Sequence, residues 1–529
     1  MRRLVPLFAF APLLALLAGC QDPVQPTAVT AAAAARAATD PLGRVHPLPP
    51  SLEQKVQRFR ADLEASGYEV ARGYWTLWGV EDCKYPLHTI GMCYGNNPTA
   101  PYVLAVVPPW TDEFVDQSFQ HVLTQPQRGM SATYRLDPQE ALVVFAELPP
   151  PGRYFGLGTN VFTRESAPNP ADPIYQRVAV DPQMQSILFG TSPNPSRMML
   201  VASIGNGTNH VVMERESGPP WGQQRFFVVT SDATLGDAMT TALLRAGVPT
   251  ADHVFTEPVA PALARLGLGS QADDFITYIR YALPTDRTAG DAWRARLPLT
   301  ILRVRRTTGS GSTQPFAVPA YHPRSANFDE RVLATDLQSL ATAVRARWGQ
   351  PDARTAPFFS LYQVFDLIGQ HCLGFPDPTR GPMDCLGDSP DADYQIGPKA
   401  HLDVDSVVAV VGALGTETGN ATYVSLSVNW FPALVGVQNL SDPDLRGTAA
   451  PFAGALQHEA RLFYLYYLAR DCAGLHPCLE VSRTLLPRGE VIRMIQRNYI
   501  NPGSASGPDP AKLLNPVAIV LDGRHRPTP

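Results

Sequence analysis

Short apolar segments alternate with proline-rich polar stretches along most of the chain. These segments are rich in β-branched and aromatic residues, which pack well on a pleated sheet, so they predict strands. Strands are expected at residues 74–80, 102–107, 141–148, 154–162, 198–204, 226–229, 299–304, 406–411 and 423–430. A further strand at 211–214 is expected to form a hairpin with 198–204 across Gly205-Asn206-Gly207.

Other segments carry apolar residues three or four positions apart, which places them on one face of a helix. The first predicted helix runs from Ser51, which has the spacing of a capping box with Gln54, to the residue before Gly67. The next begins at Thr234, its expected N-cap. Further helices are expected at 271–283, 331–348 and 451–472. The last has apolar residues on several faces, which predicts a central, buried helix.

Strands and helices follow one another without a regular βα alternation, which favours an α+β fold over a doubly wound sheet. We expect mixed sheets with packed helices and long proline-rich loops, in one large or two closely packed domains. Gly309-Ser310-Gly311-Ser312 and the polar loop after it indicate an internal boundary. The predicted regions are an N-terminal α+β region at 51–325 and a C-terminal α+β region with the central helix at 326–529.

The N-terminus has the three parts of an export signal. Arg2 and Arg3 are followed by an apolar run at 4–18 and by a small residue, Gly19, directly before Cys20. The box Leu17-Ala18-Gly19-Cys20 resembles the lipobox of bacterial lipoproteins. The resemblance implies that residues 1–19 are a signal peptide that is removed, and that Cys20 carries acyl chains such as palmitate. A plain secretory signal with an incidental cysteine is the alternative.

Lipidation at Cys20 predicts a protein of the cell envelope that is held on a membrane surface without spanning it. Gln21 stands where a retention signal of the inner membrane has aspartate, so the outer membrane is favoured in an organism with two membranes. Residues 20–50 are rich in alanine and proline and predict a tether between the lipid and the folded body.

Composition excludes one class of partner. The 529-residue chain has a formal net charge of −5 and no run of basic residues that would neutralise phosphates, so nucleic-acid binding is not expected. The expected partners are the membrane, through the lipid anchor, and an unidentified small molecule or protein.

Six further cysteines form three pairs of near neighbours in the sequence, which predicts three local disulfides in an oxidising compartment. The alternative is metal binding, because His88, His371 and His476 lie within or beside the pairs. No pair has the C-x-x-C spacing that structural zinc sites favour, so no metal and no cofactor are predicted. The expected disulfides are Cys83–Cys93, Cys372–Cys385 and Cys472–Cys478.

Several motifs resemble catalytic or metal sites but lack a required residue. His210 stands at the third glycine of a dinucleotide loop that starts at Gly205, Ala505 at the nucleophile of a hydrolase elbow, and Leu462 at the second histidine of H-E-x-x-H. No catalytic residue is therefore assigned.

Two clusters of acidic residues are further candidates for a metal or catalytic site. Asp388, Asp391 and Asp393 resemble a calcium loop without its glycine and glutamate, so a solvated acidic loop is expected. His401, Asp403 and Asp405 share one face of a strand and suit acid–base chemistry or, more simply, a polar edge.

One candidate ligand site remains in the C-terminal region. The turn 415–420 carries Glu417 and Asn420 between two apolar segments, and His458, Glu459 and Arg461 place ionisable groups on an otherwise apolar helix. Polar groups in such places need partners, and the two segments are expected to meet across a cleft. A hairpin loop and a solvent-facing histidine are the simpler alternatives.

These features favour a protein that binds a ligand or partner at the cell envelope. The alternative is a secreted-type hydrolase whose site is assembled from distant residues. A buried His–carboxylate pair in a large pocket would favour the hydrolase, and an aromatic groove without such a pair would favour binding.

Overall fold

The computed structural model describes residues 47–167, 193–307 and 313–527, with single residues at 171, 175, 176, 182 and 187. The predicted signal peptide, Cys20, most of the tether and the sequence Gly309-Ser310-Gly311-Ser312 lie outside the described residues.

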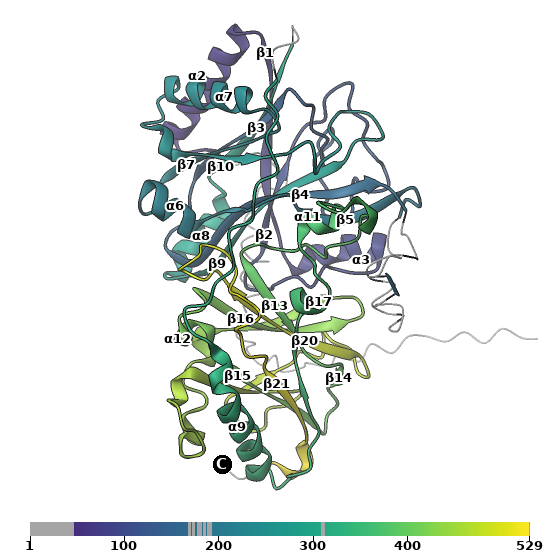
Figure 1. Ribbon diagram of the computed structural model, residues 1–529, viewed down its shortest axis with the longest axis vertical. Helices are drawn as coiled ribbons and strands as arrows, with labels where there is room; N and C mark the ends of the chain where they lie inside the picture. The colour runs from purple at the N-terminus through teal and green to yellow at the C-terminus, as the bar shows by residue number, and fades with distance from the viewer. Residues whose placement is uncertain are drawn as a thin grey trace, which may run out of the picture.

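The upper lobe of the molecule in Figure 1 is built on a ten-stranded sheet with the order β5-β4-β9-β2-β1-β10-β3-β7-β8, in which β6 also pairs with β4. All pairs are antiparallel except β7–β8. The strands are β1 (Tyr68–Trp78), β2 (Tyr102–Val106), β3 (Glu140–Glu147), β4 (Gly152–Glu165), β5 (Arg197–Ser203), β6 (Thr208–Asn209), β7 (Gln224–Thr230), β8 (Val254–Pro258), β9 (Asp274–Pro284) and β10 (Leu299–Arg306).

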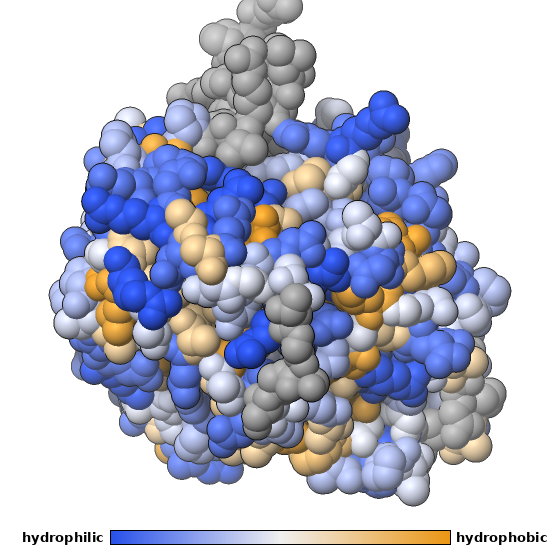
Figure 2. All heavy atoms as spheres, turned by 90° about the horizontal axis from the view of Figure 1, so that it is seen from above, coloured by the Kyte–Doolittle hydropathy of each residue, from blue (hydrophilic) through white to orange (hydrophobic). Residues whose placement is uncertain are grey.

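Helices α2 (Pro50–Ala65) and α7 (Ala233–Arg245) cover one face of this sheet. The ring of Phe59 on α2 packs at 5.3 Å from that of Phe145 on β3, which in turn packs against Phe226 on β7. Seen from above in Figure 2, this end of the molecule is largely hydrophilic, with apolar residues in small separate patches. The remaining helices of this part are η1 (Val80–Cys83), α3 (Lys84–Ile90), α6 (His210–Ser217), η2 (Ala251–His253) and α8 (Arg287–Arg296).

Two smaller sheets form the lower lobe. One has the order β12-β13-β20-β16-β17, with β14 on β20, and the other β11-β21-β15-β18-β19. Their strands are β11 (Thr355–Pro357), β12 (Phe359–Ser360), β13 (Ala392–Ile396), β14 (Ala400–His401), β15 (Ser406–Ala413), β16 (Tyr423–Phe431), β17 (Val435–Ser441), β18 (Phe463–Ala469), β19 (Cys478–Glu480), β20 (Val491–Tyr499) and β21 (Val517–Asp522).

Helix α9 (Ala334–Arg347) packs on β15 and β21 and closes this second sheet. The short helices of the C-terminal part are η3 (Glu330–Leu333), α10 (Leu361–Val364), α11 (Gly369–Cys372), η4 (Pro378–Arg380), α12 (Gly415–Thr418), α13 (Asp442–Leu445), η5 (Ala450–Ala455), η6 (Ala460–Leu462) and η7 (Gly523–His525). None of the helices in the described part of the chain is both long and apolar enough to cross a membrane.

The two lobes share their hydrophobic cores. Leu200 on β5 belongs to one core with Cys372, Leu373 and Met383 from the C-terminal half, because α11 lies against β5. A second core joins β2 and β9 to β16 and β20. The chain is therefore an α+β protein, as the sequence predicts, and of the two arrangements that the sequence leaves open, one large domain or two closely packed domains, it has the first. The boundary predicted at 325–326 falls in the long connection from β10 to η3 and stays a prediction.

Nine of the ten predicted strands are confirmed, with β1 beginning six residues before the predicted start at 74, but the strand predicted at 211–214 lies in helix α6 and two predicted helices are wrong. Residues 271–283 form β9, and residues 451–472 form two short 3-10 helices followed by β18, so the expected central helix does not exist. Both segments are dense in aromatic residues, which pack equally well on a sheet. Tyr467 illustrates this, since it is buried on β18 against Trp348, the residue directly after α9.

Two predicted turns are also wrong. The segment after Gly207 is helix α6, whose N-cap Asn209 accepts hydrogen bonds from the backbone of Val211 and Val212, and no hairpin forms. Residues 415–418 form α12, which joins two different sheets. The predicted helix starts need a smaller correction, because Asp232 caps α7 in place of Thr234 and Ser51 makes no cap on α2.

Candidate functional site

A hollow of about 800 Å³, including the space at its mouth, lies where the ten-stranded sheet meets the six-stranded sheet. A smaller hollow of about 470 Å³ adjoins it and shares Tyr94, Tyr102, Leu386 and Gly387 with it. We call the two together the double hollow. Its aromatic walls are Trp78, Tyr94, Tyr102, Phe162, Tyr278, Phe359, Tyr362, Tyr394 and Phe431.

Strand geometry explains why these side chains converge. Side chains at alternate positions point to the same face of a strand. Ile276, Tyr278 and Arg280 on β9 therefore face the smaller hollow together. Arg493, Ile495 and Arg497 on β20 face the larger hollow in the same way, next to Tyr394 and Ile396 on β13.

Arg280 is the most unusual charged group of the double hollow. Its side chain is only 4% exposed, and its guanidinium carbon lies 4.4 Å from the ring centre of Tyr102 and 5.2 Å from that of Tyr278. Nη1 donates to the hydroxyls of Tyr394 and Tyr499 at 3.3 and 3.5 Å. Within the described residues Nε has no hydrogen-bond partner and no carboxylate forms an ion pair with this arginine.

Arg497 is a second buried arginine without a carboxylate partner among the described residues. It donates to Ser427 Oγ at 2.6 Å and to the carbonyl of Gly95. The carboxylate that lines the larger hollow, Asp388, is fully engaged elsewhere, since it accepts from Ser203 N at 2.8 Å, Ser203 Oγ at 2.6 Å and Gly369 N at 3.0 Å. The described charged groups that line the double hollow are therefore mainly cationic.

The acidic loop beside the hollow corrects the sequence expectation of a solvated loop. Asp388, Asp391 and Asp393 are 4%, 5% and 0% exposed. Burial raises the pKa of each to about 6, although neighbouring hydrogen-bond donors and Arg324 hold it lower than burial alone would. Among the described residues no group of three His, Cys, Asp or Glu side chains is placed to hold a metal ion.

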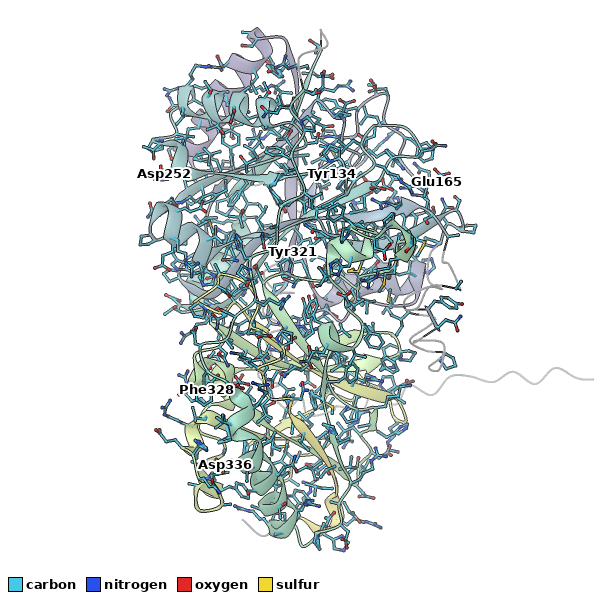
Figure 3. All side chains as sticks on the ribbon, in the orientation of Figure 1. Tyr134, Glu165, Asp252, Tyr321, Phe328 and Asp336 are labelled. Atoms are coloured by element: carbon cyan, nitrogen blue, oxygen red, sulfur yellow. A yellow bond between two sulfur atoms is a disulfide. The ribbon has the colours of Figure 1, made fainter. Side chains whose placement is uncertain are left out.

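These aspartates connect the two lobes. Asp391 accepts from Asn209 Nδ2 at 2.7 Å and from the hydroxyl of Tyr154 at 3.0 Å, and both donors belong to the upper lobe. Figure 3 shows Tyr321 at the level where the lobes meet. Its hydroxyl lies 3.0 Å from Ser203 Oγ, the group that also bonds Asp388. The hydrogen bonds of the buried acids therefore hold the walls of the hollow in place.

All three predicted disulfides are confirmed. The Cα separations are 5.3 Å for Cys83–Cys93 and 5.9 Å for both Cys372–Cys385 and Cys472–Cys478. Cys385 itself lines the larger hollow. Disulfides of this kind are typical of proteins outside the reducing cytosol.

The site predicted from the sequence lies in the lower lobe, away from the double hollow. Glu417 on α12 forms ion pairs with Arg461 at 3.3 Å and with Arg446 at 2.7 Å, and Arg461 also pairs with Glu459 at 2.6 Å. The two segments thus meet, through side chains that are already paired with each other. Their role in ligand binding stays a prediction.

Asn420 and His458 both have structural partners. Asn420 is fully buried, accepts from Phe328 N at 3.0 Å, and donates to Phe328 O and to Glu330 Oε1, each at 2.9 Å. His458 is half-exposed, and its Nδ1 lies 2.7 Å from the buried Asp336, in the lower lobe of Figure 3. His401, Asp403 and Asp405 are exposed at the edge of the six-stranded sheet and beyond it, which favours the polar-edge interpretation.

The sequence prediction missed the double hollow because its walls come from positions about 400 residues apart. One signal was present in the sequence. If residues 274–284 are taken as a strand, Tyr278 and Arg280 fall on the same face, and an arginine in a buried strand needs a partner.

No protein-family model matches the chain, and no curated protein matches it. Among solved structures, a crystal structure of an uncharacterised protein from Burkholderia cenocepacia aligns over 94% of this chain and 95% of that chain, with 10% sequence identity and a TM-score of 0.35. A likeness at that level carries no argument about fold or function.

Proposed function

We propose that this protein is a ligand-binding lipoprotein of the cell envelope that holds a small organic molecule in the double hollow. The observation that carries the proposal is the wall of the double hollow, in which nine aromatic side chains and three arginines line two adjoining hollows. Binding sites for small molecules are mainly apolar with a few placed polar groups.

The positions of the His–carboxylate pairs favour binding over the hydrolase alternative. His458 pairs with Asp336 in the lower lobe, His371 with Asp366 at 3.0 Å, His253 with Asp252 at 3.3 Å and His525 with Asp522 at 3.4 Å. All four of these pairs among the described residues lie outside the set of residues that line the double hollow. An acid–base pair would have to lie within hydrogen-bond reach of the reacting atoms to act on a molecule held there.

The compartment is part of the proposal. The disulfides indicate an oxidising compartment. The resemblance of residues 17–20 to a lipobox supports anchoring through acylated Cys20, and Gln21 supports the outer membrane. Mass spectrometry of the mature N-terminus is expected to show an acylated cysteine, and Cys20→Ser is expected to release the protein from membranes. A mature chain with a free thiol at Cys20 would contradict the anchor without affecting the hollow.

A neutral fluorescent probe tests the binding site directly. N-phenyl-1-naphthylamine is flat and apolar, and its emission rises when it enters an apolar site. We expect saturable binding of one probe per chain to the wild type. Ile396→Trp fills the larger hollow from its β13 wall and is expected to weaken binding at least tenfold.

The matched control is Leu244→Trp, which adds the same indole at an exposed position on α7, outside the hollow. This variant is expected to bind the probe as the wild type does. Binding that does not saturate, or that survives Ile396→Trp unchanged, would overturn the proposed function.

A further inference from the structure

We infer that the double hollow selects an organic anion, with a flat apolar body between the aromatic walls and its anionic group against the guanidinium of Arg280. This inference rests on the proposed function and adds the chemical class of the ligand. A carboxylate, phosphate or sulfonate has the required charge and hydrogen-bond acceptors.

The first support is the uncompensated charge. A buried charge is costly unless it is paired, so buried arginines normally have a carboxylate partner. Arg303 and Arg164 follow this rule: Arg303 pairs with Glu113 and Glu140, each at 2.5 Å, and Arg164 pairs with Asp273 at 2.7 Å. Three other buried arginines without an ion pair among the described residues donate to backbone carbonyls instead: Arg225, Arg470 and Arg497. Arg280 is as buried as all of these, but its hydrogen bonds go only to tyrosine hydroxyls and its Nε has no described partner.

The second support is that no acid among the described residues forms an ion pair or a hydrogen bond with Arg280. Asp391 is close enough for Arg280 to lower its pKa, but its oxygens accept from Asn209 and Tyr154. Asp388 is bonded by Ser203 and Gly369. The polar groups that face Arg280 are therefore acids already bonded by other donors, and tyrosine hydroxyls.

The third support is the shape of the walls. The rings of Tyr362 and Tyr394 stack at 5.9 Å with an interplanar angle of 22°, and both line the larger hollow. Tyr102 lines both hollows, and the guanidinium carbon of Arg280 lies over its ring. A planar ligand that stacks on these rings can therefore reach the guanidinium with a group at its edge.

The structural alternative is that the tyrosines alone stabilise Arg280. Cation–π contacts do stabilise a guanidinium, by about 2 kcal/mol or more when it is desolvated. In that case the arginine would only support the fold, and the hollow would bind neutral and anionic molecules alike.

Probe pairs of equal shape separate these cases. 2-Naphthoate, 2-naphthyl phosphate and the neutral 2-naphthamide are each titrated against the protein with bound N-phenyl-1-naphthylamine. We expect at least one anion to bind tenfold or more tightly than the amide. Arg280→Met is expected to abolish this preference, and Arg280→Lys to restore part of it. Relative affinities of the two anions tell a carboxylate ligand from a phosphate ligand.

Arg294→Met is the matched control, because Arg294 also lies over a tyrosine ring, at 5.2 Å from the centre of Tyr281, but has Asp291 as its partner and lines neither hollow. It is expected to keep the preference. Equal affinity of anions and amide for the wild type would overturn the inference while leaving the proposed function intact. A preference that survives Arg280→Met would overturn the assignment to Arg280. Saturable probe binding that none of the three competitors displaces would also overturn the inference. The comparison of the two anions with the amide on the wild type tests the inference even if Arg280→Met does not fold.

Discussion

The guanidinium carbon of Arg280 lies over the ring of Tyr102, 4.4 Å from the ring centre. The same ring meets Trp78 edge-on at 5.4 Å and Tyr278 at 5.6 Å, so it holds one wall of each hollow. This contact contributes to the stability of a buried cation that has no ion pair among the described residues. Substitutions of Tyr102 therefore test both the packing of these rings and the binding of a ligand.

Tyr102→Leu is expected to lower the free energy of unfolding by about 1–3 kcal/mol, because it removes a cation–π contact and two aromatic pairs. Tyr102→Phe keeps the ring and every one of these contacts, so its unfolding free energy is expected to stay within about 0.5 kcal/mol of the wild type. Urea denaturation followed by fluorescence measures both. Equal stability of the leucine and phenylalanine variants would show that the ring contributes nothing.

Loss of Cys372–Cys385 is expected to damage both stability and binding. This disulfide closes 13 residues, and Cys385 lines the larger hollow. The loop-entropy relation gives a loss of about 3 kcal/mol for its double alanine variant, and about 2 kcal/mol for that of Cys472–Cys478, which closes six residues. Probe affinity is expected to fall only in the first variant. Equal probe affinity of the two variants would show that the Cys372–Cys385 disulfide does not affect binding in the hollow.

The contribution of Asp391 to stability is expected to rise as the pH falls from about 7 to about 4, whereas buried His210, whose pKa burial lowers to about 4, contributes in the opposite direction over this range. Burial raises the pKa of Asp391 to about 6, above that of an unfolded aspartate, so the native state binds a proton that the unfolded state lacks between these values. The shift corresponds to about 2–3 kcal/mol for this one group. Asp388 and Asp393 act in the same direction, whereas exposed acids with a lowered pKa, such as Asp329, oppose the trend only at lower pH.

Asp391→Asn mimics the protonated acid and is expected to change the difference in bound protons between the native and unfolded states by about one. Asp405→Asn, at an exposed position, is the control. Chemical denaturation at several pH values between 4.5 and 7.5 gives the slopes. Identical slopes for the wild type and Asp391→Asn would contradict the raised pKa.

In the C-terminal cluster, Asn420 and Glu417 are expected to behave differently. Asn420→Ala leaves Glu330 and the backbone of Phe328 short of buried hydrogen bonds and is expected to cost about 2–4 kcal/mol. Glu417→Ala removes ion pairs to half-exposed arginines and is expected to cost less than about 1 kcal/mol. Thermal unfolding distinguishes the two, and a larger loss for Glu417→Ala would point to a role beyond these surface pairs.

The sequence was sufficient to predict features that depend on neighbouring residues. The strand at 141–148 is apolar except for Glu147 and is buried in the sheet, and each disulfide joins cysteines at most 13 positions apart. Segments 271–283 and 451–472 form strands where helices were predicted. Their apolar and aromatic residues fit both the spacing of a helix and the alternation of a strand. Pairing between strands decided in favour of the sheet, and this pairing is not visible in one sequence.

The candidate site depends on contacts that are distant in the sequence. Gly95 and Arg497 are 402 positions apart and are joined by a hydrogen bond at the larger hollow. Asp391 was expected in a solvated loop, but its partners Asn209 and Tyr154 come from the other half of the chain and allow it to be buried. No local pattern contains this information, so the sequence alone led to the cluster around Glu417 instead.

A crystal structure with 6-bromo-2-naphthoate tests the central claim most directly, because bromine is located by its anomalous scattering. We predict a bromine peak inside the double hollow, between the rings of Tyr94 and Tyr362, with the carboxylate turned towards Arg280. No bromine peak in the double hollow, or a peak only in the separate hollow lined by Arg347, Phe452 and Arg526, would contradict the claim.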